Sequence, residues 1–156
     1  MILSNVTLSR LKTQHEVIDV LISGLSEDEL HSRPIPNKWS VHENIAHVTC
    51  YQPTFLSRIK GILNQDNLYF EGYIPEEDPD FPKFLSMSAK ELLAHQKEKR
   101  TEIVNLIFNL SNEQMKRTGI HSKFGYMNIL EWTEFFLLHE AHHIYTIFKL
   151  IRSIRK

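Results

Sequence analysis

Two histidines four residues apart are the most chemically specific feature of the sequence. His139 and His143 lie within the apolar stretch 135–145. On an α-helix, residues four apart point to the same side, one turn apart along the axis, so their imidazole nitrogens can converge on one metal ion. Burying an imidazole without a partner is costly, so these histidines need either hydrogen bonds or a metal.

A catalytic metal site commonly takes three protein ligands and leaves one position for water or substrate. The segment 39–48 offers the third ligand, because His47 falls there among small and apolar neighbours. His42 lies five residues earlier, about 140° away around a helix, so the two histidines cannot point to the same place. Of the two, His47 is the predicted ligand.

The other candidates near these positions have less specific interpretations. Cys50 follows His47 by three residues and could be a soft fourth ligand, but a free cysteine is more often a small core residue. His142 lies about 100° around the helix from His143, which favours a surface position or a supporting role beside the ligands. The remaining histidines are interpreted as structural or solvated: His15, His31, His95 and His121.

Glu140 and Glu43 are the candidate catalytic carboxylates. A carboxylate close to a metal-bound water can act as a general base, and one that accepts from an imidazole can orient a ligand. Both are interpreted more readily as surface or supporting carboxylates on their helices. Trp39 and Trp132 are predicted to be large anchors of the core.

Composition limits the classes of protein to consider. The chain has 156 residues, of which 42% are hydrophobic, and 18 basic residues face 19 acidic ones. This size suits one domain, residues 1–156, and the charge balance disfavours nucleic acid as a partner. The sequence shows neither a signal peptide nor an apolar segment long enough to span a membrane, and it has a single cysteine, so a cytoplasmic location is expected.

Hydrophobic periodicity predicts an all-α protein, a four-helix bundle with no convincing pair of strands. Ser40 and Asn128 resemble N-caps, and Pro53 is expected to bend the helix near Thr49. The segment 119–126 is predicted to be a turn or a short extended connection. The long helices are expected at about 4–25, 40–65, 88–110 and 128–156, with short capped elements at 26–30 and 111–114.

The segment 66–83 is predicted to be a long loop. It contains Pro75, Pro79 and Pro82 and has no sustained period. Loops of this length are usually functional or mobile, and the aromatic residues Tyr69, Phe70, Tyr73 and Phe81 could hold this one over a site. We therefore expect a lid.

Two sequence motifs resemble those of a known family. The run Trp39-Ser-x-x-Glu-Asn-Ile-Ala-His47 and the later run His139-Glu-x-His-His143 closely resemble the DinB-like superfamily of bacterial proteins, which includes YfiT-type putative metal-dependent hydrolases. The resemblance spans nearly the whole chain. Many members continue the second run with Arg-Gly-Gln, whereas Ile144-Tyr-Thr stands here, which leaves the predicted ligands intact.

The resemblance implies an up-down-down-up four-helix bundle that binds a divalent metal, zinc or nickel, through His47, His139 and His143. It allows two chemistries: hydrolysis of a small-molecule substrate, or transfer of a low-molecular-weight thiol by an S-transferase. A homodimer is expected in either case. The alternative is a non-catalytic bundle, with a metal or without one, that acts as a homodimeric interaction or stress protein.

Overall fold

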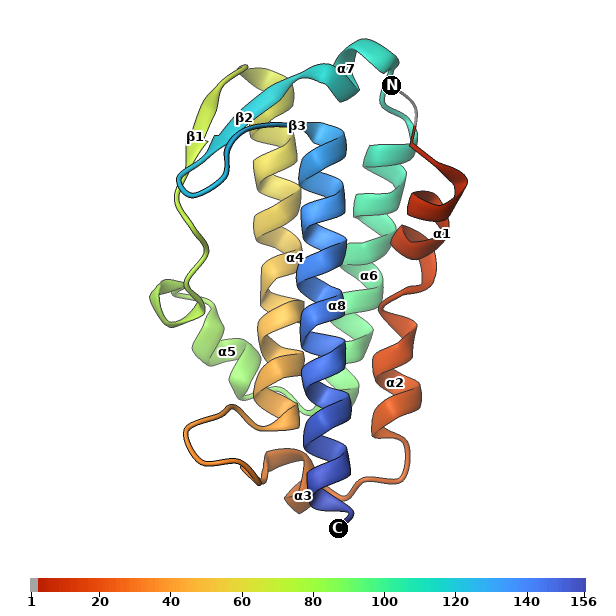
Figure 1. Cartoon of the computed structure of the whole chain (residues 1–156), viewed down its shortest axis with the longest axis vertical. Helices are drawn as coiled ribbons and strands as arrows, with labels where there is room; N and C mark the ends of the chain where they lie inside the picture. Colours follow the sequence, from red (N-terminus) through yellow and green to blue (C-terminus); the bar gives the residue numbers. More distant parts are fainter. Residues whose placement is uncertain (1–2) are drawn as a thin grey trace.

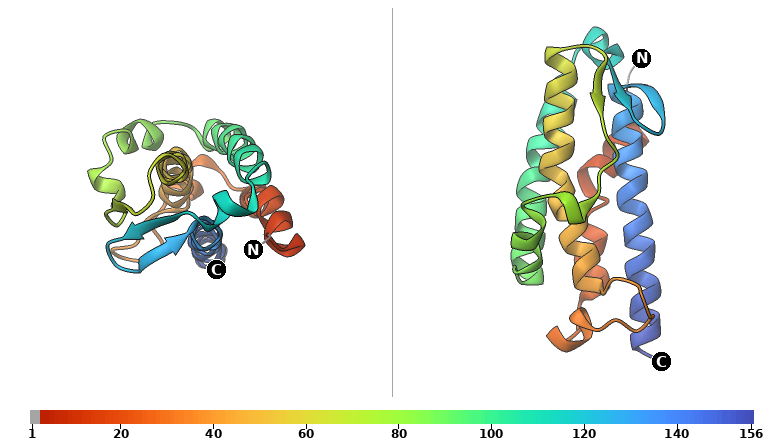
Figure 2. Two further views of the ribbon diagram at one scale, coloured as in Figure 1. Left: turned by 90° about the horizontal axis from the view of Figure 1, so that it is seen from above. Right: turned by 90° about the vertical axis from the view of Figure 1, so that its left-hand side faces the viewer.

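The protein is a bundle of four long helical segments in the computed structural model, which describes residues 3–156; Met1 and Ile2, part of the predicted domain, lie outside it. The first segment consists of α1 (Asn5–Thr13) and α2 (Glu16–Ile22), and the others are α4 (Val41–Asn64), α6 (Ala89–Phe108) and α8 (Ile129–Ile154). Figures 1 and 2 show that α4 and α6 run in the same direction, opposite to α1, α2 and α8. The predicted four-helix bundle with up-down-down-up order is confirmed.

Short helical elements connect the long helices. They are α3 (Glu27–His31), the 3-10 turn η1 (Pro75–Glu77), α5 (Phe81–Leu85) and α7 (Asn112–Lys116). A capping box precedes each of α3, α4, α6, α7 and α8, in which a Ser or Asn side chain accepts from the third helical amide and the Glu or Gln there accepts in return. Such caps satisfy amides that the helix leaves free, which explains why the helix starts were predictable.

Two helices differ in detail from the prediction. The first is interrupted between α1 and α2, where Gln14 directs its side-chain amide to Glu140 and to the Leu137 carbonyl oxygen. By contrast, α4 continues as one helix through Pro53.

A small sheet closes one end of the bundle, and the expectation of no strand pair is wrong. It consists of β1 (Leu68–Phe70), β2 (Thr118–His121) and β3 (Gly125–Asn128), with β1 parallel to β2 and β2 antiparallel to β3. The segment 66–83 is correspondingly not one loop, because it contains β1, η1 and part of α5. Strands this short give no periodic signal, and the β1–β2 pair joins segments that are distant in the chain.

The apolar core is divided into two clusters along the bundle. The cluster beneath the sheet contains Trp132, Phe136 and Phe55, which confirms Trp132 as a core anchor. The other contains Ile45, Leu92 and Ile147, with Trp39 half-buried at its edge. Within residues 3–156, no helix has the length and apolar character needed to cross a membrane.

Candidate metal centre

A polar layer separates the two apolar clusters. On α8 it comprises His139, Glu140 and His143, between Leu137 of the cluster beneath the sheet and Ile147 of the other cluster. On α4 it comprises His47 and Gln52, near the point where the two clusters meet. The polar layer has two parts. One is the histidine cluster of His47, His139 and His143, and the other is a network around the ion pair of Glu140 and Arg100.

The three predicted ligands come together in the histidine cluster. His47 Nε2 lies 2.9 Å from His139 Nε2, and one nitrogen from each of His47, His139 and His143 lies within 4.8 Å of the others. Ligand nitrogens at zinc-binding distance in a tetrahedral site are roughly 3.3 Å apart. The spacing therefore fits three ligands of one ion, and neutral imidazole is a donor that both zinc and nickel accept.

Asn44 fixes the orientation of one imidazole. Its Oδ1 lies 2.8 Å from His143 Nδ1. Because an amide oxygen only accepts, His143 must carry its proton on Nδ1, which leaves Nε2 with a free lone pair. Asn44 is 2% exposed and also donates to the Ser40 carbonyl oxygen at 2.8 Å, so its oxygen cannot turn away easily. The sequence analysis overlooked Asn44, although it stands one turn before His47 in the motif.

The cluster favours neutral imidazoles. Burial lowers the pKa of His47 to about 3, of His139 to about 4 and of His143 to about 2, and the proximity of the rings to one another or to His142 adds to the effect. Only the neutral form offers a lone pair to a metal. His47 Nδ1 is buried and has no hydrogen-bond partner within residues 3–156.

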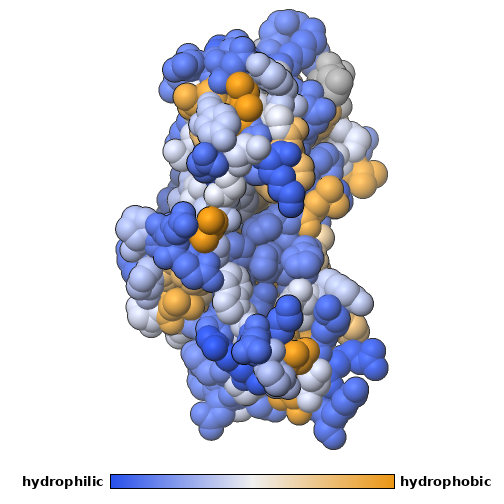
Figure 3. Space-filling model, turned by 60° about the vertical axis from the view of Figure 1, so that its left-hand side comes forward, coloured by the Kyte–Doolittle hydropathy of each residue, from blue (hydrophilic) through white to orange (hydrophobic). Residues whose placement is uncertain are grey.

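Aromatic side chains form the walls around the histidines. The Trp39 ring lies 5.3 Å from that of His47 and 6.4 Å from that of His143, and Tyr73 stacks on His47 with the ring centroids 5.6 Å apart. Tyr73 belongs to the segment predicted to be a lid, so part of that segment contacts the site. Figure 3 shows the face between the sheet and the opposite end of the bundle hollowed near its middle, with hydrophilic side chains in the hollow.

Cys50 contacts a different group of residues. Its sulfur lies 3.2 Å from the Tyr73 hydroxyl and 3.5 Å from Asp78 Oδ2. Burial raises the pKa of this thiol to about 12, and Asp78 adds to the effect. A protonated thiol is a poor metal ligand, which favours the interpretation of Cys50 as a core residue.

The two candidate catalytic carboxylates have structural partners. Glu43 accepts from the Ser40 amide at 2.7 Å in the capping box of α4 and forms an ion pair with Arg33. Glu140 is 1% exposed and pairs with Arg100 of α6. Of the two interpretations from the sequence, a surface or a supporting carboxylate, burial excludes the surface position for Glu140.

The histidines outside the cluster have varied surroundings. His42 is buried, stacks on exposed His31 and bonds the Met87 carbonyl oxygen at 2.8 Å, so it points away from the cluster as predicted. His142 is exposed, whereas His121 is buried beneath the sheet beside Trp132.

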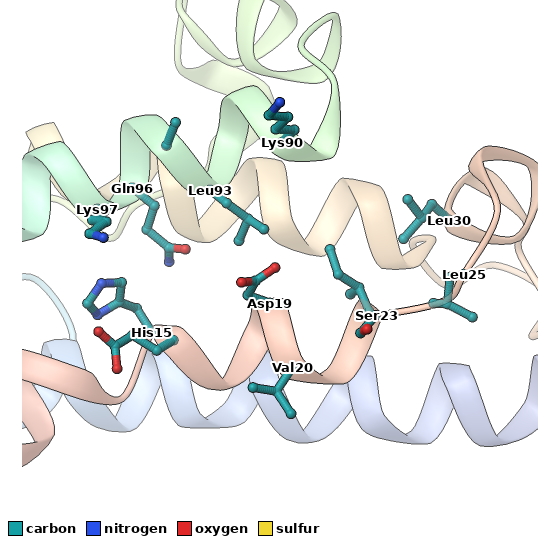
Figure 4. A pocket seen from close by; sticks show the side chains of 13 residues that line it. His15, Asp19, Val20, Ser23, Leu25, Leu30, Lys90, Leu93, Gln96 and Lys97 are labelled. Atoms are coloured by element: carbon teal, nitrogen blue, oxygen red, sulfur yellow. The ribbon is translucent and has the colours of Figure 1, made fainter.

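A cleft with a volume of about 770 Å³ lies away from the cluster, between α2 and α6. Figure 4 shows His15, Asp19 and Gln96 projecting into it. Burial, reinforced by Arg100 and Lys97, lowers the pKa of His15 to about 4.

Replacement of His15 by glutamine is expected to reduce the acid sensitivity of the fold. The unfolded chain takes up a proton near pH 6.5 but the folded protein only near pH 4, so His15 costs folding stability as the pH falls through this window, at most about 3 kcal/mol. Urea unfolding of both proteins at several pH values measures this effect. A stability difference that stays constant from about pH 7 to 4.5 would contradict it.

Comparison with known proteins agrees with the fold and the motifs. The family model described as the DinB superfamily matches residues 10–147. The chain belongs to the DinB superfamily. No curated protein sequence matches this DinB protein.

Three solved structures share the DinB fold at 18% sequence identity. YfiT from Bacillus subtilis, described as a probable metal-dependent hydrolase with an unusual four-helix bundle topology, matches with a TM-score of 0.82 over 97% of this chain and 89% of its own. The DinB-like protein YjoA from Bacillus subtilis matches with a TM-score of 0.67 over 97% and 93%. The four-helix bundle protein TT2238 matches with a TM-score of 0.66 over 91% and 95%.

Proposed function

We propose that this DinB protein is a metal-dependent hydrolase whose divalent ion, zinc or nickel, is held by His47, His139 and His143. The observation that carries the proposal is the convergence of three neutral imidazoles from two helices within 4.8 Å. The description of YfiT as a probable metal-dependent hydrolase supports the choice of reaction class. When bound, the ion would supply Lewis acidity to an ester or amide carbonyl.

The surrounding residues would position the ligands and shield the reaction. Asn44 holds His143 in the tautomer that leaves Nε2 free. Trp39 and Tyr73 cover two sides of His47 and reduce its contact with water, while His139 and His143 remain partly exposed to an incoming substrate. The Glu140–Arg100 ion pair joins α8 to α6 beside the ligands.

The function is tested by reconstitution. Protein purified without an affinity tag is stripped with a chelator, reloaded with zinc or nickel, and assayed on aryl esters and anilides. A thiol paired with an electrophile is assayed in parallel. Hydrolysis that disappears with the metal and returns on reloading supports the proposal. Turnover of the thiol alone would contradict hydrolysis and support the S-transferase hypothesis. Metal binding without turnover of either substrate would favour a non-catalytic bundle.

Replacement of Asn44 by leucine is expected to weaken metal binding about 10- to 100-fold, because His143 loses the partner that fixes its tautomer. Competition with a chromogenic chelator measures the affinity. Asn105→Leu provides a matched control on α6, away from the cluster. Equal affinities of the Asn44 variant and the wild type would show that the hydrogen bond does not support a ligand.

A further inference from the structure

A second hollow adjoins the histidine cluster on the side facing the C-terminal end of α8. Its volume is about 380 Å³, and its lining includes Asn44 and His143 from the cluster and Trp39 from the loop before α4. Because the hollow shares His143 with the cluster, a molecule in it would have one end beside the proposed metal site.

The charges around this hollow have one sign. Lys38 and Lys149 line it, and among its described lining residues none is acidic. Neither lysine forms an ion pair within residues 3–156. The Lys149 ammonium lies 4.9 Å from the centre of the Tyr145 ring, which restrains its position. The hollow therefore attracts anions.

The hollow on the other side of α4 has a different charge distribution. It is lined by Cys50, Arg58, Asp78 and Asp80, and its volume is about 410 Å³. Its two carboxylates outnumber its one guanidinium, so it is less favourable to an anionic group than the hollow lined by the two lysines. An acidic substrate is therefore directed toward Lys38 and Lys149.

The hollow extends along α8, from His142 to Leu150. Lys149 follows His143 by six residues on one helix, which corresponds to an axial rise of about 9 Å. Trp39 lines the hollow with its ring 6.4 Å from that of His143, and Leu150 adds a further apolar surface. This arrangement suits an acidic group joined by an apolar stem to the group that reacts.

We propose that this hollow is a substrate subsite and that Lys38 and Lys149 bind a carboxylate of the molecule whose scissile ester or amide bond lies at the histidine cluster. The proposal rests on the proposed function, because it places the scissile bond at the histidine cluster. The described lining contains no arginine, so the two ammonium groups alone would hold the anion.

The test uses binding and does not depend on turnover. Cobalt-loaded protein is titrated with mercaptohexanoate and with mercaptohexanol, and dissociation constants are read from the thiolate-to-cobalt absorption band. Both thiols can bind the metal, but only the acid can also reach the lysines. The acid is expected to bind roughly five- to tenfold more tightly, and added salt should reduce the difference.

Matched variants assign the effect to the subsite. Lys38→Gln and Lys149→Gln should each reduce the preference for the acid, whereas Lys60→Gln, an exposed lysine on α4 outside the hollow, should preserve it. Equal binding of acid and alcohol by the wild type, or an unchanged preference in both lysine variants, would overturn the subsite while leaving the metal site intact.

A metal-free measurement separates failure of the subsite from failure of the metal site. If cobalt does not bind, the proposed function fails. The chain is then titrated with adipate and with hexanediol while backbone amide shifts are recorded. Shifts at Lys38, Trp39 and Lys149 with adipate only would still support an anion subsite, and their absence would overturn it.

Discussion

Replacement of Glu140 by alanine is expected to lower the free energy of unfolding by about 3–5 kcal/mol. The Glu140 and Arg100 side chains are 2% and 1% exposed and form an ion pair, to which Gln14 and Gln96 add hydrogen bonds at 3.0 and 3.3 Å. Removal of the carboxylate leaves the buried guanidinium without a counter-charge, which is more costly than the loss of an exposed pair. Urea unfolding at neutral pH measures the change.

Glu134→Ala is the matched control on the same helix. Glu134 pairs with Arg10 at 2.9 Å, but its side chain is 35% exposed, so water can replace much of the interaction and the loss should be no more than about 1 kcal/mol. A similarly small loss for Glu140→Ala would contradict the structural role of Glu140. Loss of hydrolysis with unchanged stability would instead restore the general-base hypothesis.

Replacement of His139 by alanine is expected to weaken metal binding about a thousandfold, because three-ligand binding loses one of its donors. Its melting temperature without metal should change little. The imidazole lies on a partly exposed wall, whereas Trp132, Phe136 and Ile147 anchor α8 in the two apolar clusters. Elemental analysis and thermal unfolding of the metal-free protein measure the two effects.

His142→Ala is the matched control for His139→Ala, because it removes a neighbouring histidine that is not a predicted ligand. His142 is exposed and lies three residues after His139, outside the group of converging nitrogens. It should retain near wild-type affinity. Equal losses in both variants, or normal metal content in His139→Ala, would reject the predicted ligand set. Unfolding of metal-free His139→Ala would indicate a structural cluster.

Local sequence signals predicted much of the fold. Ser40 and Asn128 cap their helices through contacts with residues three positions away, so the helix starts could be found from the chain alone. The small sheet could not be predicted, because β2 depends on a distant partner strand and on Gly119, where a side-chain carbon would approach Ile62 at 2.8 Å.

The candidate site was likewise predictable only in part from the sequence. The sequence by itself determined that His139 and His143 share one face of a helix, because four-residue spacing fixes their relative direction. Only the tertiary structure placed His47 beside them, brought Asn44 into hydrogen-bond contact with His143 and made Lys38 part of the lining of the hollow. The tertiary structure also brought Glu140 into an ion pair with Arg100. Helical periodicity gives the direction of a side chain around its own axis, but the packing of neighbouring helices decides which charge it meets.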